Sequence, residues 1–148
     1  MNEIQFEFLR IEDEQYATLP ENFRANTPIA EELGLQFAYD PGKRLVLCKS
    51  AITAQHASTN IFLRIGLSCV FRLSPDSWDT FFKIPTEAEQ PKLEVRKPVL
   101  YHFGAFTVGT LRGYAFARTA GFHYRPTLPP INVVALVDRA EEIVGDFF

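Results

Sequence analysis

The sequence predicts an α+β domain in which a four-stranded antiparallel sheet carries two C-terminal helices on one face. Two features support this class. Apolar and polar residues alternate with a period of two through most of the first half, as in strands with one buried face. Beyond residue 98 the pattern becomes helical, and strands followed by helices are typical of α+β domains. With 148 residues, the chain is expected to form one domain, 1–148, with a substantial core.

The four expected strands cover about 3–12, 34–40, 44–55 and 60–73. In the first strand, Phe6 and Phe8 alternate with polar residues. The segment 40–43, Asp-Pro-Gly-Lys, predicts a turn between the second and third strands. The fourth strand is the clearest, because every odd position is apolar whereas Arg64 and Arg72 lie on the opposite face. One face is therefore expected to be core and the other to meet solvent.

The two expected C-terminal helices cover about 98–121 and 132–145. Asn132 is the expected N-cap of the second helix. Ser74 and Pro75 predict a short additional helix directly after the fourth strand, since serine is a good N-cap and proline suits the first helical position. The polar segment 86–98, which is bracketed by prolines, is expected to be a surface linker.

The long helix is apolar on nearly every side, which predicts that nearly every side is buried. Its main apolar face is expected to comprise Val99, Phe103, Phe106, Tyr114 and Ala117. One sheet and a second helix do not cover the whole helix, so we expect a homo-oligomer, either a dimer or a tetramer. Close approach of the copies is expected at Gly109, Gly113, Phe116 and Ala120. The alternative is a helix buried wholly within one chain.

Composition and charge disfavour several functional classes. The net charge is -3, with acids and bases interspersed, which argues against nucleic acid as a partner. Arg112 and Arg118 interrupt the most apolar long stretch, and each would cost about 2.5 kcal/mol or more near a bilayer centre. The N-terminus is acidic, unlike a signal peptide. We expect a soluble, cytoplasmic protein without membrane insertion, in which Cys48 and Cys69 are reduced thiols packed within strands.

The sequence shows no pattern typical of an enzyme. The three histidines are scattered, and His102 has no histidine or glutamate at metal-ligand spacing along its helix. The chain contains no GxSxG, P-loop or GxGxxG motif. Strand placement argues against either cysteine as a nucleophile. We therefore expect no catalytic residues, no metal ion and no cofactor.

Residues 106–137 resemble the C-terminal third of the bacterial export chaperone SecB and its relatives. The shared pattern is a long helix that ends in aromatic residues, a short loop, and the run Leu-Pro-Pro-Ile-Asn at 128–132, which opens the final helix. The segment 4–16, IQFEFLRIEDEQY, is similar to the opening strand of that family. The order of strands, linker and helices also agrees, so the likeness covers most of the chain.

The resemblance implies an assembly of two dimers and a function as an ATP-independent holdase. Members of the family bind unfolded preproteins in apolar grooves beside the helices and pass them to the SecA motor. On this chain the resemblance implies polypeptide binding near six residues. They are Trp78, Phe81 and Phe82 after the fourth strand, and Ile131, Val134 and Leu136 on the final helix.

Two departures from the family weaken the expectation that SecA is bound. The chain stops at Val-Gly-Asp-Phe-Phe, where the well-known export chaperones have a polar tail. Arg64 and Arg72 lie on the outward sheet face, which is acidic in those chaperones. Two alternatives therefore stay open: a SecB-like chaperone dedicated to one client such as an antitoxin, and a ligand-binding module that shares only the fold.

Overall fold

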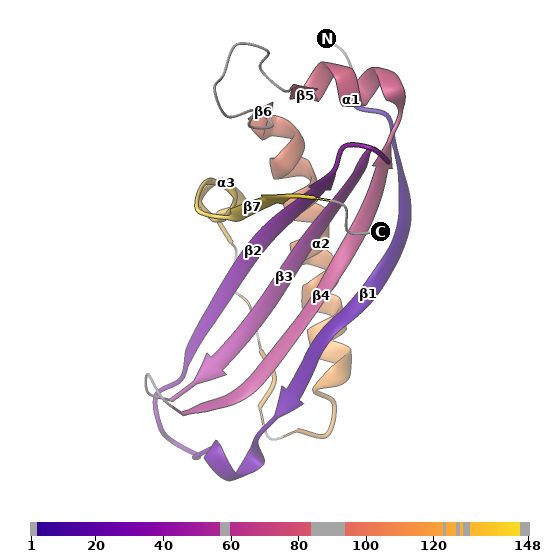
Figure 1. Ribbon diagram of the computed structural model, residues 1–148. Coiled ribbons are helices and arrows are strands. Elements are labelled where there is room, and N and C mark those ends of the chain that lie inside the picture. Colours follow the sequence, from indigo (N-terminus) through magenta and orange to yellow (C-terminus); the bar gives the residue numbers. More distant parts are fainter. Residues whose placement is uncertain are drawn as a thin grey trace.

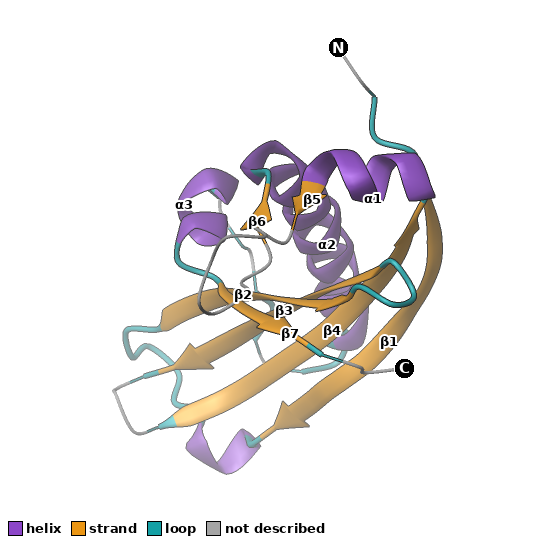
Figure 2. Cartoon of the chain, turned by 45° about the horizontal axis from the view of Figure 1, so that its top comes forward, coloured by secondary structure: helices purple, strands orange, loops and turns teal. Residues whose placement is uncertain are grey.

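The computed structural model describes residues 3–56, 60–83, 94–122, 124–126, 128 and 131–145. A curved sheet forms one layer, and helix α2 (Lys97–Arg118) lies along one face of it (Figure 1). Helix α3 (Val133–Asp138) packs beside α2 and against the sheet, while α1 (Pro75–Phe81) lies at one end of the sheet (Figure 2). The opposite face of the sheet carries no described helix, so the core forms between the sheet and α2.

The sheet contains five strands in the order β1-β4-β3-β2-β7. They are β1 (Phe6–Thr18), β2 (Ala30–Asp40), β3 (Leu45–Gln55), β4 (Ile61–Leu73) and β7 (Glu141–Val144). The first four strands pair antiparallel, whereas β7 pairs parallel with β2. A second, two-stranded sheet and one short 3-10 helix complete the described elements: β5 (Phe82–Lys83), β6 (Glu94–Val95) and η1 (Pro20–Asn22).

The predicted α+β class and its four antiparallel strands are confirmed, but the predicted end of the chain is wrong. The final helix was expected to reach residue 145 and no strand was expected after residue 98. Instead α3 ends at Asp138 and β7 follows. Asn132 is the N-cap, as predicted, and accepts a hydrogen bond from the backbone of Ala135. The β-branched residues Ile143 and Val144 favour a strand, and the edge of β2 supplies the backbone partners.

Two strand boundaries also differ from the prediction. β1 continues to Thr18 instead of ending near residue 12, and β2 begins at Ala30 instead of residue 34. The register of β1 against β4 shifts twice, between Phe8 and Arg10 and again between Asp13 and Gln15. Each shift breaks the period-two alternation, so the pattern ends before the strand does.

The local signals between these elements are confirmed where the structure describes them. The Ser74 side chain accepts a hydrogen bond from the Ser77 backbone at the start of α1. The turn over 40–43 closes with a bond from the Lys43 N–H to the Asp40 carbonyl. Most of the predicted linker, residues 86–93, lies outside the described residues, and its end forms β6 and the start of α2.

The face of β4 that carries the odd-numbered residues packs under α2, as the alternation predicted. Cys48 of β3 and Cys69 of β4 are paired neighbours in this core, and both are free thiols. The predicted main apolar face of α2 is partly wrong, because Phe106 and Ala117 are exposed. The buried residues of α2 are instead Val99, Leu100, Phe103, Gly104, Thr107, Val108, Leu111 and Ala115.

Gly104 is where α2, α3 and β2 approach most closely among the described glycines. A Cβ atom there would lie 3.2 Å from Cγ2 of Val137 and 3.3 Å from Cδ1 of Leu35. The missing side chain therefore lets α3 sit against both the long helix and the sheet. This contact fixes where α3 lies relative to the edge of β2.

Candidate functional site

The outer edge of β2 is open along its first half. β3 pairs with β2 on one side from Ala30 to Asp40, whereas β7 pairs on the other side only with Gln36–Tyr39. Within the described part of the chain, residues 30–35 thus have a strand on one side only. Outward-facing backbone N–H and C=O groups on such an edge are ready to pair with another extended chain.

An apolar hollow of about 250 Å³ lies between this open edge and α3. Both sides of the hollow are apolar. Leu33 of β2 lines one side, and the other side is lined by Ile131, which precedes α3, and by Leu136 of α3. Glu31 and Arg139 add one charge of each sign. The complete lining is Glu31, Leu33, Leu128, Ile131, Asn132, Ala135, Leu136 and Arg139. The hollow therefore offers space for apolar side chains directly beside unpaired backbone.

A hydrogen bond from Tyr124 helps to hold the segment before α3 against β2. Its hydroxyl donates to the carboxylate of Glu31. Burial raises the pKa of Tyr124, and the bond to Glu31 raises this pKa further. Tyr124 is a protonated donor at neutral pH, and the raised pKa keeps it so to higher pH. Leu128, which follows in the same segment, is buried and closes one side of the hollow.

The structure brings together only part of the predicted polypeptide-binding set. Ile131 and Leu136 line the hollow, and their role in polypeptide binding stays a prediction. Val134 is 47% exposed on α3 and is not part of the lining. Sequence reasoning missed Leu33 because the predicted strand began at residue 34, four residues after the observed start of β2 at Ala30. It missed Leu128 because that residue was used only as part of the Leu-Pro-Pro-Ile-Asn pattern.

The three aromatic residues after β4 lie elsewhere. Trp78 and Phe82 are buried, and their rings stack with centroids 4.2 Å apart. Phe81 is half-buried, with the guanidinium of Arg96 at 5.9 Å from its ring centroid. None of the three lines the hollow beside α3. Their role in polypeptide binding stays a prediction.

A second apolar surface follows the other edge of the sheet. We call Phe6, Phe8, Ile11 and Phe106 the β1–α2 strip; all four are exposed. The rings of Phe8 and Phe106 lie 5.1 Å apart, so the strand and the helix present one continuous apolar surface. β1 is the edge strand here, and among the described residues it pairs only with β4.

The residues predicted at an interface between copies are all exposed in the single chain. No atom lies within 4 Å of a Cβ built at Gly109 or Gly113, and Phe116 is 56% exposed. Ala120 is exposed as well. The alternative in which α2 is buried wholly within one chain is therefore wrong. Contact with a second copy stays a prediction.

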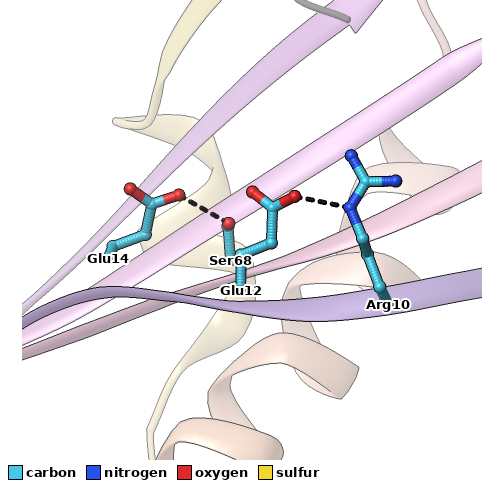
Figure 3. Close-up of polar contacts among 4 residues, drawn as sticks. All are labelled: Arg10, Glu12, Glu14 and Ser68. Carbon is cyan, nitrogen blue, oxygen red and sulfur yellow. Dashed lines mark hydrogen bonds and ion pairs between the residues drawn. The ribbon is translucent and has the colours of Figure 1, made fainter.

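The helix-free face of the sheet carries charges of both signs. Arg64 and Arg72 are exposed there, as predicted. Glu7 of β1 lies 3.8 Å from the Arg72 guanidinium. Elsewhere on this face Glu14 accepts a hydrogen bond of 2.7 Å from the Ser68 hydroxyl, and Glu12 pairs with Arg10 (Figure 3). A shallow hollow of about 560 Å³ on this face is lined mainly by charged and polar residues. The face is thus mixed in charge.

Neither native cysteine is an activated nucleophile. Burial raises the pKa of the Cys48 thiol to about 12, and the pKa of Cys69 is raised for the same reason. Both therefore stay protonated at neutral pH and are poor nucleophiles. The described residues hold no group of three or more metal-ligating side chains. No described helix is both long and apolar enough to span a membrane.

Comparison with known proteins found similarity only at the level of structure. No protein-family model and no curated protein sequence matches the chain. A SecB-like chaperone of Mycobacterium tuberculosis, Rv1957, solved with a ChAD peptide from the HigA1 antitoxin, is 14% identical with a TM-score of 0.45. The match covers 88% of this chain and 87% of that one. A Streptococcus agalactiae protein of unknown function is 10% identical with a TM-score of 0.43, over 88% of this chain and 100% of that one.

Proposed function

We propose that this protein is an ATP-independent chaperone that holds extended, unfolded polypeptide along the open edge of β2. The observation that carries the proposal is the position of the apolar hollow directly beside residues 30–35 of that edge. Main-chain hydrogen bonds to the edge need no particular client sequence. Alternate side chains of a strand point the same way, so every second client residue would face the Leu33 side of the edge and reach the hollow.

The open edge of β2 and the apolar hollow both select unfolded clients. A folded protein has already paired nearly all its buried backbone groups and apolar side chains, so it has little to offer to a strand edge. The hollow, at about 250 Å³, is smaller than the roughly 300–1,000 Å³ typical of small-molecule sites. It suits one or two apolar side chains better than a drug-sized ligand. At this hollow, the volume favours polypeptide side chains over a small-molecule ligand.

The proposed activity needs no cofactor and no catalytic residue. We propose that the protein acts in the cytoplasm. Its form is either general export or service to one client such as an antitoxin. The resemblance of residues 106–137 to the SecB family supports the holdase activity in both cases. The helix-free sheet face carries Arg64 and Arg72 as well as acidic residues, whereas the resemblance implies an acidic face for SecA binding. This mixed charge favours the dedicated client over transfer to SecA.

We also propose that a second copy covers the exposed side of α2. The exposed residues Gly109, Gly113, Phe116 and Ala120, together with the β1–α2 strip, supply the apolar surface for this contact. Fully burying one phenylalanine side chain contributes about 1.5–3 kcal/mol, whereas association itself costs about 4–15 kcal/mol, so most of these apolar side chains must be buried together. The hollow beside α3 lies on the other edge strand, and association through α2 leaves it open.

The proposal is tested by aggregation of an unfolded client at equal molar ratio without nucleotide. The wild-type protein should suppress aggregation, and Ile131→Asp should lose most of this protection because it places a charge in the hollow. Leu19→Asp is the control, because it makes a comparable apolar-to-charged change at a residue that does not line the hollow. Urea unfolding of both variants checks that the partly buried Ile131 position still folds. Equal protection by both variants would contradict the proposed site. No protection by the wild-type protein, with several clients, would contradict the proposed function.

A further inference from the structure

Strand β7 occupies the continuation of the edge at which the client is proposed to bind. The open part of β2 is residues 30–35, and the next residues, Gln36–Tyr39, pair with β7. Arg139, at the end of α3, lines the hollow, and β7 starts two residues later. A client strand that runs along the open edge toward Tyr39 therefore meets β7 in its path.

Among the described residues, few interactions hold β7 on the sheet. Each of its four residues is exposed, so its attachment buries little apolar surface. Parallel pairing is also slightly weaker per residue than antiparallel pairing. Beyond the ladder, the Tyr39 hydroxyl donates to Oε1 of Glu142 at 2.7 Å, and the Gly145 N–H donates to the Tyr39 carbonyl at 3.0 Å. An exposed strand with this little packing belongs to the low-stability end of a fold.

We propose that β7 is a resident strand that a bound extended chain displaces from β2. The inference rests on the proposed function, because the displacing chain is the client. Without a client, β7 pairs the backbone of Gln36–Tyr39 and shortens an edge that would otherwise invite pairing between copies. With a client, its release lengthens the binding edge. Short client segments then bind beside β7, whereas longer segments must release it.

A disulfide between β2 and β7 tests whether client binding requires the release of β7. Ala38 and Ile143 are register partners, and both side chains line the helix-free face. Neighbouring strands lie about 4.8 Å apart, within the range of about 4.4–6.8 Å between Cα atoms that a disulfide spans. The double variant Ala38→Cys, Ile143→Cys should thus lock β7 onto β2 when oxidised. The native cysteines are buried with raised pKa values, so they do not compete for the new bond.

A proline in β7 tests whether weaker pairing of β7 with β2 strengthens client binding. Ile143→Pro removes a backbone donor and disfavours the strand, whereas Ile143→Ala removes the same apolar side chain and keeps the ladder. While β7 pairs with β2, only the fraction of protein with β7 released can bind a long client. Loss of β7 pairing therefore raises the apparent client affinity by the ratio of paired to released protein. If pairing of β7 with β2 is worth about 1–2 kcal/mol, a long client should bind Ile143→Pro roughly five- to thirty-fold more tightly than Ile143→Ala.

The probes are fluorescein-labelled peptides of about five and about ten residues that alternate leucine with serine. The longer peptide should bind the oxidised double variant at least about tenfold more weakly than its reduced form, and Ile143→Pro more tightly than Ile143→Ala. The shorter peptide should bind all forms alike. If the longer peptide also binds all forms alike, strand exchange is wrong and the proposed function stands. If neither peptide binds any form, both proposals are wrong.

Discussion

Replacement of Gly104 by alanine tests how α3 is held beside the edge of β2. Alanine in place of an interior helix glycine stabilises by about 0.8–1.0 kcal/mol through helix propensity alone. At residue 104 the new Cβ would lie 3.2 Å from Val137 and 3.3 Å from Leu35, which belong to different elements, so moving away from one contact tightens the other. Overpacking of this kind costs about 1–3 kcal/mol. We therefore expect Gly104→Ala to be destabilising by up to about 2 kcal/mol.

Gly109→Ala on the same helix is the matched control. A Cβ there meets no atom within 4 Å, so only the gain in propensity remains. The difference between the two variants cancels propensity and leaves the packing cost of about 1–3 kcal/mol. With a urea m-value of about 2 kcal/mol/M, the unfolding midpoints should differ by about 0.5–1.5 M. Measurement at two protein concentrations separates any contribution from association. Equal midpoints would refute the close contact at Gly104.

The remaining predictions concern association and pH. Gly113→Leu should weaken self-association measured by sedimentation, because it adds bulk to the exposed side of α2 without a clash inside the chain; a wild-type protein that is monomeric at every concentration would contradict the proposed interface. The free energy of unfolding should fall as pH rises from 9 toward about 12, because the pKa of Cys48 is raised from 9.0 to about 12 in the folded state and the unfolded chain loses that proton first. The raised pKa of Tyr39 adds to the loss above pH 10. Cys48→Ala should flatten this decline in urea unfolding, and an unchanged slope would contradict the assignment.

The sequence was sufficient to predict the elements whose signal is local. The alternation of β4, the turn over 40–43, the cap at Ser74 and nearly the whole length of α2 depend on neighbouring residues, and all are confirmed. β1 was predicted too short because its bulges interrupt the alternation. Bulges are set by pairing with β4, and a sequence pattern does not report them.

The end of the chain and the site depend on contacts between distant segments. Residues 141–144 give opposing local signals, because the two glutamates suit a helix and the β-branched Ile143 and Val144 suit a strand, so the edge of β2 decides the outcome. The same edge brings Leu33 to Ile131 and Leu136 across about a hundred positions of sequence, which periodicity alone does not reveal. The resemblance to the SecB family implied a groove near Trp78 and Phe82, whose rings stack on each other in the interior.

Hydrogen exchange of the backbone amides in residues 30–35 tests the central claim most directly. The measurement compares the protein alone with the protein bound to a reduced, unfolded client under conditions in which aggregation is suppressed. If the client pairs with the open edge of β2, the outward-facing amides of this segment should exchange more slowly in the complex. Amides of β4 in the sheet interior should not change. Unchanged exchange in residues 30–35, with new protection along β1 instead, would show that the client binds elsewhere and would contradict the account.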